Sequence, residues 1–209
     1  MHKDILTAKQ VKLLPLIREF SRDYYLVGGT AIALYLGHRR SIDFDLFTSG
    51  QIKKLSIKKV IDRHSCPVSD ILFEDSEQIH LVIDGVKLTF FSYPYLIDTP
   101  TAFERIIRIP DLLTLAAMKA YALGGRAKWK DYVDLYFLLR DHFSLLQVSE
   151  KSKELFSSFY NEKLFREQLC YFKDIDYSEK VDLVDPLVSD DKIKHFLTNV
   201  ATNPFQREI

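Results

Sequence analysis

Two aspartates, Asp43 and Asp45, stand one residue apart in the segment IDFDL, residues 42–46. Because side chains alternate between the two faces of a β-strand, both carboxylates should point to one face and the apolar residues around them to the other. Two carboxylates this close repel each other in a site shielded from water unless a cation lies between them. A hard divalent ion suits the pair, since it takes oxygen ligands and keeps positions open for water and phosphates. The pair therefore predicts a Mg²⁺ site, with Mn²⁺ as the alternative ion.

A glycine pair and a hydroxyl residue precede the aspartates. Gly28, Gly29 and Thr30 lie between an apolar segment, residues 24–27, and a helical pattern that begins near Ala31. This order predicts backbone N–H groups and a hydroxyl at a helix N-terminus, where phosphate oxygens bind favourably. Taken singly, a glycine pair is usually a turn, and a D-x-D is usually the solvated face of a strand. Their combination in one short stretch favours a site for a metal-bound nucleotide.

The composition is that of an ordinary globular protein. Of 209 residues, 47% are hydrophobic, and 29 Lys and Arg balance 29 Asp and Glu. This balance indicates neither nucleic acid nor a membrane as a general partner, although a local basic patch stays open. Cys66 and Cys170 lie far apart and lack metal-ligand spacing, which argues for a reducing compartment and against a zinc site. Without a signal sequence or a membrane-length apolar run, a cytoplasmic protein is expected.

The apolar periodicity predicts an α+β fold. Helical spacing is found at residues 7–20 and 51–62, and strand patterns are found at residues 68–73, 79–83 and 86–91. Asp84-Gly85 between the last two strands is a hairpin signal. The strands should extend the sheet that bears the aspartates, in an antiparallel or mixed arrangement with helices on one face.

The second half of the chain should be a helical bundle. After three prolines, helices are predicted at residues 111–123, 130–140, 149–159, 162–172 and 190–200. We place the boundary near Thr99, which gives a mixed α/β domain at residues 1–98 and a helical domain at residues 99–209.

A second group of charged residues lies in this helical half. Asp131 and Asp134, three apart on a predicted helix, share a face, and Asp131 lies in the first turn, where the helix dipole favours an anion. An acidic first turn beside Lys130 is also ordinary helix capping. Lys119, taken alone, is typical of a surface lysine.

The stretch GGTAIALYLGHRRSIDFDLF, residues 28–47, resembles the signature of the nucleotidyltransferase family that includes the AbiEii and AbiGii toxins of abortive-infection systems. This family belongs to the polymerase-beta-like superfamily. A second segment, with Lys119 followed by Arg126, Lys130, Asp131 and Asp134, is similar to the family's second signature. The resemblance implies a nucleotidyltransferase-like N-terminal domain that moves a nucleoside monophosphate from a nucleoside triphosphate to an acceptor hydroxyl. It also implies tRNA as one acceptor and a separately encoded antitoxin as a partner.

The resemblance further implies roles for individual residues. Asp43 and Asp45 would hold the metal, Lys119 would contact phosphate, and Asp131 would take part in catalysis or complete the metal shell. Asp134 carries over more weakly. The implied nucleotide-binding residues are Gly28, Gly29, Thr30, Arg39, Ser41, which would shape the turn, and Lys130.

One departure from the superfamily pattern leaves two alternatives open. Where many members carry a third metal-binding acid, the strand at residues 86–91 has Lys87 and Thr89, and Asp84 sits too far along. Either two aspartates act with a group from the helical half, such as Asp131, or metal affinity is impaired. The chain would then be a catalytically degenerate module of the same fold that binds a nucleotide or a partner. A helical scaffold with an incidental D-x-D is the third interpretation.

Overall fold

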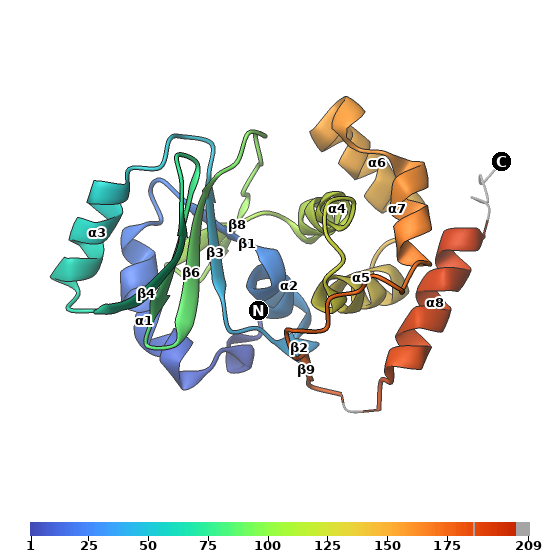
Figure 1. Ribbon diagram of the computed structural model, residues 1–209, viewed down its shortest axis with the longest axis horizontal. Coiled ribbons are helices and arrows are strands. Elements are labelled where there is room, and N and C mark those ends of the chain that lie inside the picture. The colour runs from blue at the N-terminus through green and yellow to red at the C-terminus, as the bar shows by residue number, and fades with distance from the viewer. Residues whose placement is uncertain (186, 204–209) are drawn as a thin grey trace. The chain divides into compact units, whose positions relative to one another are not determined.

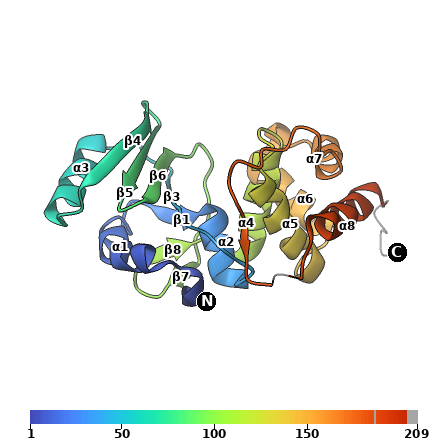
Figure 2. The same cartoon turned by 60° about the horizontal axis from the view of Figure 1, so that its bottom comes forward.

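The computed structural model describes residues 1–185 and 187–203 and divides into two compact units, Met1–Asp111 and Leu112–Ile209 (Figures 1 and 2). The division comes after residue 111 because two short strands that follow Thr99, β7 and β8, belong to the sheet of the first unit. Sequence analysis had placed the boundary before these strands. They escape sequence patterns because each is three residues long, too short to display alternation.

Within residues 1–111, all of which are described, seven strands form one mixed sheet in the order β4-β5-β6-β3-β1-β8-β7. The strands are β1 (Tyr25–Val27), β3 (Phe44–Thr48), β4 (Val68–Glu74), β5 (Gln78–Ile83), β6 (Val86–Ser92), β7 (Thr101–Phe103) and β8 (Ile107–Ile109), and the two-residue β2 is Arg39–Arg40. β3 runs parallel to β6 and β1 runs parallel to β8, whereas the remaining neighbours are antiparallel. Asp84 and Gly85 both have positive φ in the β5–β6 turn, so the predicted hairpin is confirmed.

The helices of the first unit cover both faces of this sheet, not one face as the sequence analysis expected. They are η1 (Lys3–Ile5), α1 (Ala8–Glu19), α2 (Gly28–Leu36) and α3 (Lys54–Arg63). Figure 1 shows α1 and α3 on one side of the strands and α2 on the other. The ring of Phe20, the residue after α1, packs edge-on against the Phe90 ring, with 4.8 Å between the ring centroids. This contact belongs to the main core. α2 packs on β1 and β3 from the opposite side, because the chain turns directly from β1 into this helix.

The second unit is helical, as predicted. Its elements are α4 (Leu112–Leu123), α5 (Trp129–Asp141), α6 (Leu145–Phe156), η2 (Ser157–Phe159), α7 (Glu162–Leu169), β9 (Asp182–Leu183) and α8 (Asp190–Thr202). The central helix α5 buries Tyr132, Leu135 and Leu138 completely. α6 begins four residues earlier than predicted because Ser144 and Gln147 form a capping box. Among the described helices, none is long and apolar enough to cross a bilayer.

Candidate active site

The register between β1 and β3 brings the glycine pair to the second aspartate. Val27 lies opposite Asp45 in the antiparallel ladder, so Gly28, which follows Val27, lies against the Asp45 side chain. Gly28 has φ +74°, and a Cβ atom at this position would collide with Asp45 Oδ2. Only glycine tolerates both the left-handed backbone and this close approach. The structure thus brings the acid and the glycine corner together, as the sequence analysis expected.

The corner forms the first turn of α2, which begins at Gly28 and not near Ala31. The first N–H groups of a helix have no partner within the helix, and the N-cap residue, Val27, offers no side-chain acceptor to them. These amides, together with the positive end of the helix dipole, suit a phosphate oxygen.

Arg39 and Ser41 pack on the same corner. A Cβ atom at Gly29 would collide with Arg39 Nη2 and would come within 3.3 Å of Ser41 Oγ. The Thr30 hydroxyl donates to Ser41 Oγ at 2.9 Å and is also within hydrogen-bonding reach of the Asp43 carbonyl oxygen. Thr30 is 1% exposed, so its side chain ties α2 to the aspartate strand, and only its backbone N–H remains for a phosphate.

A row of polar side chains continues across the strands from the two aspartates. In the parallel β3–β6 ladder, Asp45 lies opposite Thr89, and His80 on β5 lies opposite Thr89 from the other side. Lys87 Nζ is 3.8 Å from Asp43 Oδ2, and both side chains are largely buried. The acids therefore face a lysine and a histidine that sequence analysis did not include among the site residues.

His80 is held mainly in its neutral form. Burial lowers the pKa of His80, and the charge of Lys87 lowers it further, against opposing effects of Asp45 and Asp75. The alternation of buried and half-buried residues along β5 could have indicated His80 as a site residue, because its side chain points away from the buried face formed by Ile79 and Leu81.

The two aspartates fit a hard divalent cation. Across the described residues, 1–185 and 187–203, no cluster of three His, Cys, Asp or Glu side chains is formed. A Mg²⁺ held by Asp43 and Asp45 would therefore take its remaining ligands from water and phosphate oxygens, which is how this ion is commonly bound in proteins. The helix N-terminus at Gly28 lies beside Asp45, which is the side from which phosphate oxygens could reach such an ion.

Four charged residues of the second unit form an ion cluster, which we call the buried ion cluster: Lys119, Arg126, Asp131 and Asp134. Lys119 Nζ donates to Asp131 Oδ1 at 2.6 Å and lies 3.1 Å from Asp134 Oδ2. Arg126 Nε donates to Asp131 Oδ2 at 2.8 Å, and its Nη2 donates to Asp131 Oδ1 at 3.2 Å. Both oxygens of Asp131 therefore accept hydrogen bonds from cations of its own unit.

Burial differs sharply within this ion cluster. Asp131 and Asp134 are 0% exposed and Lys119 is 4% exposed, whereas the Arg126 side chain is 48% exposed. Burial acts to raise the pKa of Asp131, but Lys119 and Arg126 outweigh it and hold this pKa below its ordinary value. The carboxylate stays ionised and is a weak proton acceptor. The position of the Asp131 carboxylate suits it to hold the Arg126 side chain in place. Arg126 was not among the site residues expected from the sequence.

Lys130 points to a different partner. Its ammonium and that of Lys128 both donate to the Glu179 carboxylate. Burial acts to raise the pKa of Glu179, but the two lysines outweigh it and lower this pKa to about 2. Lys130 is therefore engaged in an ion pair with Glu179.

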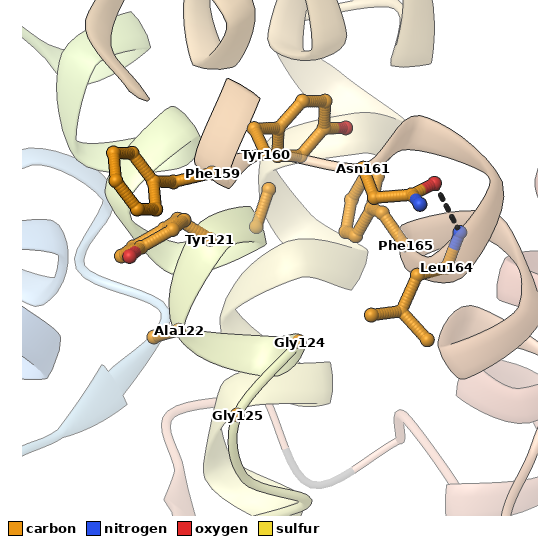
Figure 3. Close-up of a pocket in the computed structure, with 10 residues that line it drawn as sticks. Tyr121, Ala122, Gly124, Gly125, Phe159, Tyr160, Asn161, Leu164 and Phe165 are labelled. Carbon is orange, nitrogen blue, oxygen red and sulfur yellow. Dashed lines mark hydrogen bonds between the residues drawn. The ribbon is translucent and has the colours of Figure 1, made fainter. Parts of the chain in front are cut away.

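A hollow of about 320 Å³ lies between the end of α4, η2 and the start of α7 (Figure 3). Its lining is aromatic, aliphatic or small, apart from Asn161, and comprises Ala120, Tyr121, Ala122, Gly124, Gly125, Phe159, Tyr160, Asn161, Leu164 and Phe165. The Asn161 side chain caps α7 by accepting from the Leu164 N–H at 3.1 Å. Without a charged lining residue, this hollow does not suit a triphosphate.

Comparison with known proteins identifies the family. The family model described as "Nucleotidyl transferase AbiEii toxin, Type IV TA system" matches residues 16–205. An uncharacterized protein of Aquifex aeolicus (strain VF5), aq_aa25, is 33% identical over 159 residues, which cover 73% of this chain and 75% of that protein.

Two solved structures are similar in fold. MenT4, the nucleotidyltransferase toxin Rv2826c from Mycobacterium tuberculosis H37Rv, superposes with a TM-score of 0.62 at 13% identity, over 92% of this chain and 81% of that chain. JHP933 from Helicobacter pylori superposes with a TM-score of 0.56 at 18% identity, over 94% and 91% of the two chains. At these identities the likeness establishes the fold.

Proposed function

The chain belongs to the nucleotidyl transferase AbiEii toxin family and is a nucleotidyltransferase, and on this premise we propose that it transfers a nucleoside monophosphate from a nucleoside triphosphate to an acceptor hydroxyl with the help of Mg²⁺. The observation that carries the proposal is the position of Asp45 against Gly28. This position supports the proposal because it puts a carboxylate oxygen beside the amides of a helix N-terminus, the two kinds of group that would hold a metal-bound triphosphate.

The residues of the first unit would share the work as follows. Asp43 and Asp45 hold the cation, which supplies positive charge against the phosphate oxygens of the reacting triphosphate. The N–H groups at Gly28, Gly29 and Thr30 bind phosphate oxygens, and Arg39 adds positive charge beside Gly29. Ser41 keeps the corner in shape. The acceptor oxygen then attacks the α-phosphorus, and pyrophosphate leaves with the electrons of the bond that breaks.

The buried ion cluster would act through Arg126 and Lys119. We assign Lys119 and Arg126 to phosphate charge and Asp131 to holding both cations in position, with Asp134 as the second partner of Lys119. Cations fixed in advance stabilise charge without reorganisation during the reaction. Lys130 would aid nucleotide binding only after exchange from Glu179.

The biological part of the proposal rests on the family. We assign the chain to the cytoplasm as the toxin of a toxin–antitoxin or abortive-infection pair, with tRNA as the acceptor and a separately encoded antitoxin as the partner. An open reading frame beside the gene that encodes a small protein would support the pairing.

A transfer assay tests this function. Purified protein is incubated with Mg²⁺, each labelled triphosphate in turn and total tRNA, and both pyrophosphate release and labelled RNA are measured. Transfer of label, lost in Asp45→Asn, is the expected result. A matched reaction without Mg²⁺ should give no label.

The alternative is a catalytically degenerate module of the same fold, favoured by the missing third acid on β6. Nucleotide binding without pyrophosphate release, for every triphosphate and with RNA or protein acceptors, would establish this module and reject the transfer reaction.

A further inference from the structure

Lys87 lies on the same face of the sheet as the two aspartates. Phe44 lies opposite Leu88 in the parallel β3–β6 ladder, and this register sets Lys87 beside Asp43. The Lys87 Nζ atom is 3.8 Å from Asp43 Oδ2, with 29% of the lysine side chain and 17% of the aspartate side chain exposed. An ammonium this close to a metal-binding carboxylate, and partly shielded from water, acts strongly on any cation bound there.

The charge of Lys87 has two opposite consequences. Lys87 lies against one of the two carboxylates, so a second divalent cation in the site would meet a fixed positive charge. A phosphate meets the same charge favourably, because an ammonium is a compact donor with three hydrogens. The ion pair between Lys87 and Asp43 occupies one side of the Lys87 ammonium.

The neighbours of Lys87 along the polar row of β3, β5 and β6 do not supply this charge. His80, across β6 from Asp45, is mainly neutral at pH 7 because burial and Lys87 lower its pKa. Thr89, opposite Asp45, is uncharged. Lys87 is thus the fixed cation in the polar row of β3, β5 and β6.

Resting on the proposed function, we propose that Lys87 takes the place of a second divalent cation: Asp43 and Asp45 hold a single Mg²⁺, and the Lys87 ammonium binds the triphosphate. A lysine that only neutralises Asp43 would behave differently when it is removed. Its loss would change metal binding and leave triphosphate binding as it was.

The test separates these two effects with two replacements and a control. Lys87→Met removes the charge, and Lys87→Glu replaces it with a third carboxylate. The control is Lys58→Met, in the same unit, because Lys58 is also ion-paired, with Nζ 3.4 Å from Glu74 Oε2. Mn²⁺ binding to the full chain is counted by electron paramagnetic resonance, and calorimetry measures the binding of the α,β-methylene triphosphates of the four bases with Mg²⁺.

We expect a single Mn²⁺ on the wild-type chain. Lys87→Met should weaken binding of the triphosphate analogue by about tenfold or more without weakening Mn²⁺ binding. Lys87→Glu should bind Mn²⁺ at least about tenfold more tightly and accept a second ion. Lys58→Met should match the wild type in both measurements.

The proposal is overturned if Lys87→Met binds the analogue as the wild type does, or if the wild type binds two Mn²⁺ ions that Asp45→Asn removes. Failure of the proposed function has a different signature, since the wild type would then bind none of the four analogues. In that event the Mn²⁺ measurement still tests the role of Lys87. Tighter Mn²⁺ binding in Lys87→Glu would support the exclusion of a second cation by Lys87, and unchanged Mn²⁺ binding would overturn that exclusion.

Discussion

Each unit of the protein holds a pair of aspartates close together in sequence, and the two pairs are used in opposite ways. Asp45 lies on β3 and Asp43 directly before it, both half-buried, beside a corner of backbone amides. Asp131 and Asp134 are fully buried on a helix and are already satisfied by Lys119 and Arg126. The first pair lies half-buried with Lys87 near Asp43, whereas the second pair is enclosed by Lys119 and Arg126. The difference shows that the spacing of two aspartates does not tell a half-buried pair beside backbone amides from a pair enclosed by cations of its own unit.

The largest effect is expected at the buried pair. Asp131→Asn removes the charge that Lys119 and Arg126 both contact, and breaking a buried ion pair costs about 3–5 kcal/mol. The free energy of unfolding, followed in urea by the fluorescence of Trp129, the single tryptophan, should fall by this amount. Asp141→Asn, on the same helix but in an exposed pair with Arg140, should cost about 1 kcal/mol or less. Equal losses in the two variants would contradict the comparison.

Replacement of Asp45 in the first pair should lower the activity and leave the stability almost unchanged. Asp45→Asn removes a charged ligand of the proposed Mg²⁺, and the rate of transfer should fall by roughly 10²–10³. Since the side chain is not fully buried, the free energy of unfolding should change by less than about 0.5 kcal/mol. Pyrophosphate release and calorimetric unfolding measure the two quantities. A loss of stability as large as that of Asp131→Asn would erase the distinction between the pairs.

The glycine corner should show both effects at a smaller scale. Gly28→Ala places a Cβ atom against Asp45 in a backbone with φ +74°, and such strain costs about 1–3 kcal/mol. Binding of the triphosphate analogue should weaken as well, because the carboxylate and the amides are displaced together. Gly50→Ala is the matched control, since its Cβ meets only Thr48 Oγ1, at 3.5 Å. If both variants bind the analogue equally, the corner is not part of the site.

Acid should weaken the buried pair through a single carboxyl group, the smallest of these effects. The pKa of Asp131 is held below its ordinary value of 3.8, so the folded state binds this proton less readily than the unfolded state. Its contribution to stability is complete above pH 3.8 and is lost as the pH falls further towards the lowered value. The free energy of unfolding, measured from pH 6 downwards, should therefore decline less steeply below this point in Asp131→Asn. Identical slopes would show that Asp131 does not carry this dependence.

The sequence by itself predicted the longer helices and strands and the proximity of the glycine pair to the aspartates. Alternation in residues 42–46 predicted both acids on one face. The glycine pair indicated that a helix starts nearby, and helical periodicity predicted the second unit. These features are local, since they depend on spacing along a single strand or helix. The family signature rests on the same residues.

Only the tertiary structure decided which charges are compensated. The register of β1, β3 and β6 sets Gly28 against Asp45 and Lys87 beside Asp43, although these residues lie far apart in sequence. The packing of α4 against α5 buries Lys119 between two aspartates. Strand register and helix packing are set by contacts across the fold, and a spacing along the chain does not contain them.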